Sequence, residues 1–200
     1  TSALGHGWSW DDFSASYMVE RSALPVYGNV TRWYQSTSRK ENPQFAGDTL
    51  DVYISSEPEV NWPITFAPPD TTGQFEINRN RDANRLTITE GKEKSAQAEV
   101  PFVTMGITTA LQLLTDTVHK IIIRIEDGSA VLKKQSPAVN KVFSQSTDSM
   151  LKPMMHRSDN FFAEQTLLMA GREMTGKFNE TEAINRLLDT DLKGMPQRPR

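Results

Sequence analysis

The triplet Ser158-Asp159-Asn160 combines three polar side chains directly before an apolar run that predicts a helix. Ser, Asp and Asn are the favoured N-cap residues of helices, so any of the three can accept a hydrogen bond from the first turn. A serine and an asparagine at this spacing can also serve acyl transfer at a serine enzyme. There the serine passes protons, and the asparagine holds a lysine or the substrate amide. The triplet alone favours capping and leaves the catalytic interpretation open.

The segment Ser149-Met-Leu-Lys152 matches the S-x-x-K pattern of a serine nucleophile, because one helical turn brings the serine Oγ near the lysine Nζ. Two features oppose this interpretation. Lys152 precedes Ser158 by only six residues, whereas the two elements must meet across a cleft from separate segments. Pro153 also distorts the helix that would present the pair. We therefore expect Ser149 and Lys152 to be surface residues.

A third candidate is the segment Trp8-Ser-Trp10-Asp11-Asp12. Two tryptophans beside two carboxylates could form the wall of a binding site with an anionic point. Alternatively, the rings anchor a β-rich core and the carboxylates cap a turn. The residues alone favour this second interpretation.

The sequence contains little that supports a metal site and nothing that supports cysteine chemistry. The histidines His6, His119 and His156 lie far apart, and a neighbouring carboxylate such as Asp116 or Asp159 supplies only a second ligand. Because a zinc site needs three or four ligands, we expect no metal site. The chain has no cysteine, which excludes disulfides and a cysteine nucleophile.

Charge and hydropathy exclude two further classes of protein. The 22 basic and 25 acidic residues give a net charge of −3, whereas a nucleic-acid binder usually carries an excess of basic residues. No segment approaches the ~20 apolar residues of a transmembrane helix. The chain begins at Thr1 and ends in a proline- and arginine-rich stretch, so we expect an internal part of a longer protein.

The elements that must position these residues change in type near residue 100. All four Trp and all four Tyr lie within the first 62 residues, and seven of eight Met follow residue 100. Aromatic residues favour strands and Met favours helices, so the sequence predicts an α+β fold with a β-rich first half and a mainly helical second half. Strands are predicted at Tyr17–Glu20 and Tyr27–Tyr34, as a hairpin, and at Thr49–Ser55, Asn61–Phe66, Gly73–Asn78 and Arg85–Thr89.

Helical spacing appears after Pro101. Helices are predicted at Ile107–His119, Thr147–His156, Phe161–Ala170 (ended by Gly171) and Glu180–Leu188 (capped by Asn179 or Thr181), and a short buried strand is predicted at Ile121–Ile125.

The order of the motifs resembles one family. Gly5–Asp12 (GHGWSWDD), Lys134–Pro137 (KQSP) and His156–Glu164 (HRSDNFFAE) follow one another as in the D-alanyl-D-alanine carboxypeptidase/endopeptidase family, the class C low-molecular-mass penicillin-binding proteins. The segment Asp189–Pro199 resembles the stretch before the D-G-S-G-L-S-R sequence of that family. The resemblance covers essentially the whole chain. In that family the nucleophilic S-x-x-K lies upstream of the Trp segment and the K-T-G lies downstream of the S-D-N helix. No K-T-G, K-S-G or H-T-G occurs in these 200 residues.

The resemblance implies a function and a set of site residues. It implies part of a serine-type D-Ala-D-Ala carboxypeptidase/endopeptidase that acts on peptidoglycan stem peptides, and these 200 residues alone are expected to be inactive. Ser158 and Asn160 would be catalytic, while Asp11 or Asp12, with Tyr17, would recognise the free amine of the stem-peptide diamino acid. No metal or organic cofactor is implied. β-Lactam antibiotics would bind the complete protein, and the location would be the periplasm or cell envelope.

The resemblance also predicts two domains. Residues 1–100 would be the β-rich part of an inserted non-catalytic region, and residues 101–200 a partial penicillin-binding domain that carries the S-x-N element. The alternative is a non-catalytic cell-envelope module that binds glycan, peptide or protein through its Trp-rich half.

Overall fold

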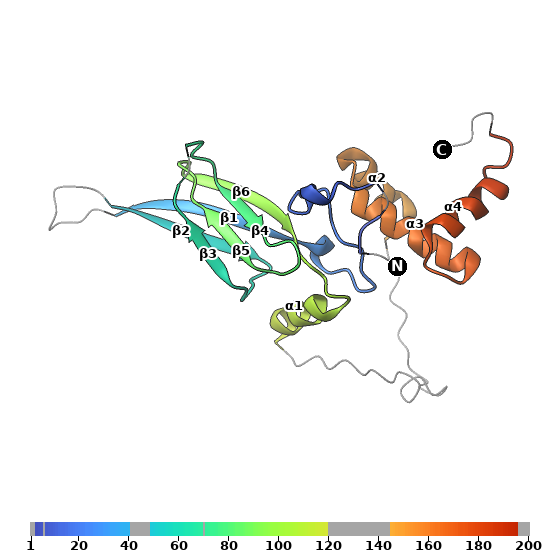
Figure 1. The fold of residues 1–200 in the computed structure, drawn as a ribbon, viewed down its shortest axis with the longest axis horizontal. Coiled ribbons are helices and arrows are strands. Elements are labelled where there is room, and N and C mark those ends of the chain that lie inside the picture. The colour runs from blue at the N-terminus through green and yellow to red at the C-terminus, as the bar shows by residue number, and fades with distance from the viewer. Residues whose placement is uncertain (1–2, 6, 41–48, 70, 120–144, 196–200) are drawn as a thin grey trace.

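A computed structural model describes residues 3–5, 7–40, 49–69, 71–119 and 145–195. Within these residues the chain has an α+β fold. A body of two β-sheets lies at one end, the helices α2, α3 and α4 lie at the other, and the N-terminal segment runs between them (Figure 1).

The first sheet is antiparallel and has the strand order β2-β1-β6. Its strands are β1 (Val30–Lys40), β2 (Thr49–Glu57) and β6 (Ser95–Pro101). Side chains alternate along β1 because successive residues of a strand point to opposite faces. Thr31, Trp33 and Gln35 are buried. Arg32 and Tyr34 therefore point to the outer face, opposite the outward residues of β6.

The second sheet has the order β3-β5-β4, with β3 parallel and β4 antiparallel to β5. Its strands are short: β3 (Ile64–Ala67), β4 (Glu76–Arg79) and β5 (Leu86–Thr89). The central strand is the most buried, and Leu86 and Ile88 are fully buried.

The hydrophobic core lies between the two sheets. Trp33 and Val100 from the first sheet meet Leu86 and Ile88 from the second in one cluster of buried residues. The helix α1 (Thr108–Val118) adds Ala110 and Leu113 to this cluster. The first helix after residue 100 therefore packs with the sheets, and the division into domains 1–100 and 101–200 stays a prediction.

The remaining helices are α2 (Thr147–Arg157), α3 (Asn160–Thr175) and α4 (Glu180–Asp189). Gly171 is buried where α3 packs on α4, and a Cβ at this position would lie 2.6 Å from the Cβ of Ala183. Such a contact leaves no room for a side chain, and Gly171 lies inside α3, which continues to Thr175. The prediction that Gly171 ends the helix is wrong. The helix ends at Gly176, which has the left-handed conformation (φ 78°) that glycine adopts readily.

The N-terminal segment joins the two ends of the molecule. The indole Nε1 of Trp8 donates to Oε1 of Glu164 on α3 at 2.8 Å. The buried Arg21 forms ion pairs with Glu164 and with Glu180 of α4. On the other side, Arg79 of β4 donates to the carbonyl oxygen of Phe13 at 2.8 Å. Residues before β1 are thus held against both the helices and the second sheet.

The predicted hairpin is wrong: its first strand is absent, and its second, predicted at Tyr27–Tyr34, begins only at Val30. Tyr17–Glu20 is irregular chain, and the residues Tyr27–Asn29 before β1 form a short 3-10 helix, η2. The partners of β1 are therefore β2 and β6 rather than a preceding strand. The side chain of Asn29 stabilises the path of the chain before β1. Its Oδ1 accepts from the backbone N–H of Val26, and its Nδ2 donates to the carbonyl oxygen of Glu20. The predicted strand Ile121–Ile125 lies outside the described residues.

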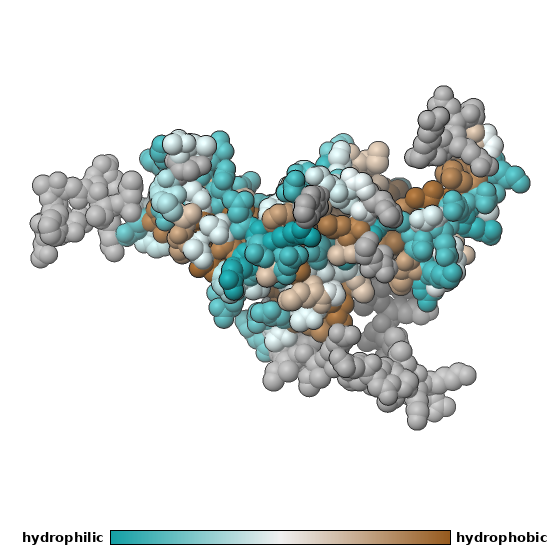
Figure 2. All heavy atoms as spheres, in the orientation of Figure 1, coloured by the Kyte–Doolittle hydropathy of each residue, from teal (hydrophilic) through white to brown (hydrophobic). Residues whose placement is uncertain are grey.

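Apolar side chains reach the surface around the helices at the end of the described chain (Figure 2). Met155 and Met169 are both more than half exposed. None of the described helices is long and apolar enough to cross a membrane.

Candidate functional site

At the junction between α2 and α3, the residue that caps the helix is neither of the two residues predicted to be catalytic. Asp159 is the N-cap of α3, and its carboxylate accepts from the backbone N–H of Phe162 at 3.0 Å. Ser158 ends α2 in the left-handed conformation (φ 52°), which is unfavourable for a residue with a Cβ. Since Asp159 supplies the cap, the hydroxyl of Ser158 and the amide of Asn160 are left for other partners.

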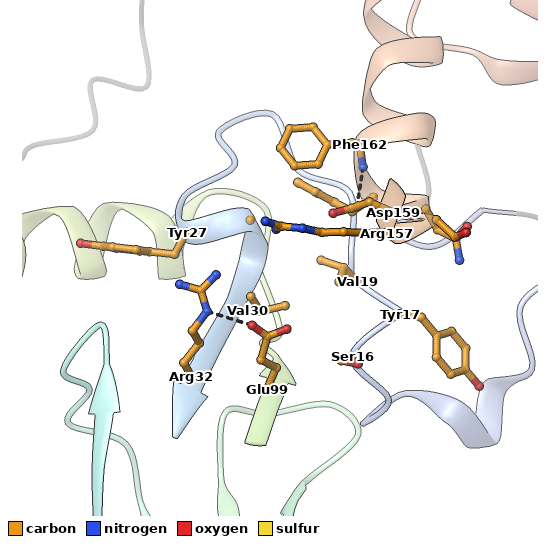
Figure 3. A pocket seen from close by; sticks show the side chains of 14 residues that line it. Ser16, Tyr17, Val19, Tyr27, Val30, Arg32, Glu99, Arg157, Asp159 and Phe162 are labelled. Atoms are coloured by element: carbon orange, nitrogen blue, oxygen red, sulfur yellow. Dashed lines mark hydrogen bonds and ion pairs between the residues drawn. The ribbon is translucent and has the colours of Figure 1, made fainter. Parts of the chain in front are cut away.

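This junction lines a pocket of about 400 Å³. Three other parts of the chain contribute to it: the N-terminal segment, the start of β1 and the end of β6 (Figure 3). The pocket therefore lies where the β-body, the N-terminal segment and the helices meet. Its lining includes Ser158, Asn160 and Tyr17, so the structure brings together three of the five residues predicted from the sequence.

Tyr17 connects the pocket to the Trp segment. Its ring stacks on Trp8 with a centroid distance of 5.9 Å. Hydrogen bonding to the carboxylate of Asp12, with smaller effects of desolvation and of the negative charge, raises the pKa of Tyr17 above its ordinary value. Asp12 thus acts on the hydroxyl of Tyr17 at the pocket edge.

Asp11 and Asp12 do not line the pocket themselves. Both belong to a 3-10 helix, η1 (Trp10–Asp12), in which Asp11 is exposed and Asp12 is half-buried. Asp12 reaches the site through Tyr17, whereas Asp11 has no such connection among the described residues. Trp8, which is half-buried, anchors the segment to α3 rather than lying in the core between the sheets.

The charged wall of the pocket was not predicted from the sequence. Arg157 at the end of α2 points across the pocket towards β1, where Arg32 and Glu99 form an ion pair at 2.8 Å (Figure 3). This hydrogen-bonded pair raises the pKa of Arg32 above its ordinary value. Arg157 directly precedes the triplet in the sequence, but only the pairing of β1 with β6 shows which charges face it.

Ser149 and Lys152 lie on exposed parts of α2 and do not line the pocket. The Ser149 hydroxyl lies 2.8 Å from the Oγ of Ser146, the N-cap of α2. Both residues are thus on the surface, as predicted.

Among the described residues, no group of three or more His, Asp or Glu side chains is placed to hold a metal ion. His119 and His156 are both exposed, at the ends of α1 and α2. The segment Lys134–Pro137 lies outside the described residues.

Comparison with known proteins decides the family. The family model of the D-Ala-D-Ala carboxypeptidase 3 (S13) family matches residues 1–192. The chain belongs to this family. The resemblance drawn from the order of the sequence motifs is therefore confirmed.

A solved structure supports the fold of this S13 family member. The crystal structure of penicillin-binding protein 4 from Haemophilus influenzae matches with a TM-score of 0.62 and 16% sequence identity. The match covers 96% of this chain and 44% of that chain, so the chain spans less than half of the solved protein. No curated protein matches the sequence. The predicted α+β fold is confirmed.

Proposed function

We propose that this S13 segment contributes to a serine-type D-Ala-D-Ala carboxypeptidase/endopeptidase that acts on peptidoglycan stem peptides. The observation that carries the proposal is the pocket that gathers Ser158, Asn160 and Tyr17 from separate elements. Family membership supplies the class of reaction.

In the proposed reaction, a serine outside these 200 residues attacks the carbonyl carbon of the D-Ala-D-Ala bond. The C–N bond breaks, the terminal D-Ala leaves as its amine, and water then hydrolyses the acyl-enzyme ester. Ser158 relays the proton that the leaving amine takes up. Asn160 orients the substrate amide or the neighbouring lysine by hydrogen bonding.

The amine of the stem-peptide diamino acid would bind on the Tyr17 side of the pocket. Asp12 supplies the negative charge there, and Trp8 and Tyr17 supply an aromatic wall. Asp11 remains a second candidate for the anionic group because it lies beside Asp12 in η1. No metal or organic cofactor takes part in this reaction.

The proposed substrate also suggests the location and a class of inhibitor. Peptidoglycan stem peptides lie outside the cytoplasmic membrane, so the protein would work in the periplasm or cell envelope. A β-lactam would acylate the same serine in the full-length protein.

The proposal is tested with Asn160→Ala in the full-length protein. We expect penicillin acylation to slow by ~10²-fold or more, the usual effect of removing one well-placed polar group from such a site. Asn185→Ala is the matched control, since Asn185 is an exposed asparagine on α4. Intact-mass spectrometry over time measures both rates. A folded Asn160→Ala protein that is acylated at the wild-type rate would contradict the role of Asn160. A wild-type protein that neither takes up penicillin nor cleaves D-Ala-D-Ala peptides would contradict the function itself.

A further inference from the structure

The pocket at the α2–α3 junction continues into a groove on the outer face of the first sheet. A second hollow, of about 660 Å³, shares Ser16, Arg32, Glu99 and Arg157 with the pocket. A third, of about 520 Å³, shares Tyr34 and Gln97 with the second. The pocket overlaps the second hollow and the second overlaps the third, so the three form one continuous track. We call the part beyond the pocket, lined by Arg157, Arg32, Glu99, Tyr34 and Gln97, the sheet groove.

The register of the first sheet explains the lining of the groove. Arg32 pairs with Glu99 and Tyr34 pairs with Gln97 across β1 and β6. Along each strand, residues two apart share a face and lie about 6.6 Å from each other. The groove therefore presents two successive pairs of polar side chains. The distance between the pairs equals the distance between every second side chain of an extended peptide.

The charges of the groove favour a ligand that carries a carboxylate. Glu99 neutralises Arg32 at 2.8 Å, whereas none of the described residues forms an ion pair with Arg157. A guanidinium that faces a groove can bind a carboxylate with two parallel hydrogen bonds. Arg157 lies next to Ser158, so such a carboxylate would be held close to the candidate catalytic residues.

We propose that the sheet groove binds a second peptide chain of the substrate, with Arg157 holding one of its carboxylates and Tyr34 and Gln97 contacting the chain further on. This inference rests on the proposed function, because it places the second stem peptide of a cross-linked pair beyond the pocket. The repeat of the groove and the charge of Arg157 match an extended peptide that carries a carboxylate at the Arg157 end. Beyond the pocket, Tyr34 and the half-buried Phe75 are the only aromatic residues among the described residues that line the two further hollows, which gives a glycan chain little to stack on there.

The experiment measures kcat and KM of the full-length protein on two substrates: a single peptide ending in D-Ala-D-Ala, and a cross-linked pair of stem peptides. We expect Arg157→Ala to raise KM about tenfold or more for the cross-linked pair, the effect of losing a hydrogen bond to a charged group. Arg157 also lines the pocket, whereas Gln97 lies beyond it, so Gln97→Ala is the variant that should change the single peptide and penicillin acylation by less than about twofold.

Arg186→Ala is the matched control. Arg186 is also an exposed arginine in the last turn of a helix, so both substitutions remove the same favourable interaction with the helix dipole. Gln97→Ala should raise KM for the cross-linked pair by about threefold, and Gln112→Ala, an exposed glutamine on α1, should not.

Two results would overturn the groove while the proposed function stands. Equal losses on the single peptide and the cross-linked pair would place Arg157 in the reaction site only. A loss that appears only with substrates carrying an intact glycan chain would assign the track to sugar. If the wild type cleaves neither peptide and takes up no penicillin, the proposed function fails instead.

Discussion

At the scale of single residues, the three members of the triplet Ser158-Asp159-Asn160 have different structural roles. Asp159 accepts a hydrogen bond from the backbone N–H of Phe162 and so caps the start of α3. Its two neighbours are therefore not needed as caps. Ser158 holds a left-handed backbone that turns the chain between α2 and α3. Both flanking side chains then line the pocket.

A residue-scale prediction separates Asp12 from Asp11. Asp12→Asn keeps an oxygen acceptor for the Tyr17 hydroxyl but removes the negative charge. In the full-length protein we expect KM to rise about tenfold or more for peptides whose diamino acid has a free amine, with penicillin acylation unchanged. Asp11→Asn should have a smaller effect, because Asp11 is exposed and does not contact Tyr17.

Steady-state kinetics on amine-bearing and amine-acetylated peptides checks this prediction. The effect of Asp12→Asn should disappear with the acetylated peptide, because its former amine carries no positive charge. If both peptides and penicillin lose the same rate, Asp12 acts by holding the fold of η1 and recognises no amine.

At the scale of elements, the contact between α3 and α4 holds the helix that begins at the triplet. Gly171→Leu would push these helices apart, because even a Cβ at this position approaches Ala183 to 2.6 Å. Leucine has a better helix propensity than glycine by about 0.8 kcal/mol, which offsets part of the loss. We expect the free energy of unfolding to fall by about 2 kcal/mol, and Tm to fall by roughly 4–8 °C.

Thermal unfolding of the chain, followed by circular dichroism, measures this loss. Ala170→Leu is the matched control, because Ala170 is the exposed neighbour of Gly171 on the same helix. Equal Tm values for the two variants would show that α3 and α4 do not pack through Gly171.

The sequence predicted the helices better than the strands, for a physical reason. The helices α1, α2 and α4 begin and end within one residue of their predicted positions, because periodicity and caps such as Asn179 are local signals. Strand β6 was missed. Its inward residues Ala96 and Ala98 are small, so the alternation between apolar and polar residues is weak.

The candidate site was predicted in part. Ser158, Asn160 and Tyr17 were found from motif order and share the pocket. The pair Arg32–Glu99 was missed because its residues lie 67 positions apart and meet only through the pairing of β1 with β6. Local patterns therefore indicate candidate site residues, whereas the charged wall of the pocket depends on strand register.

At the scale of the whole molecule, the N-terminal segment places the β-body next to the helices. Arg21 contacts α3 and α4, and Arg79 on β4 contacts Phe13. The pocket forms at this junction, so its shape depends on both ends of the molecule. The site is therefore a property of the assembled chain and of no single element.

The last prediction concerns the 200-residue chain on its own. Acylation needs a nucleophilic serine, its lysine and the strand that aligns the substrate carboxylate, whereas these 200 residues carry only the proposed S-x-N element. Ser149 and Lys152 are exposed and away from the pocket, and no K-T-G occurs in the sequence. Groups that act as a unit lose nearly all of the rate when one is missing.

We therefore expect no covalent adduct when this chain is incubated with a penicillin. Intact-mass spectrometry checks the prediction, with the full-length protein as the positive control. Ser149→Ala in the full-length protein should also leave acylation at the wild-type rate, since its hydroxyl bonds to Ser146 on the surface of α2. A stoichiometric mass increase equal to the drug, mapped to Ser149 or Ser158, would show that the nucleophile lies within these residues.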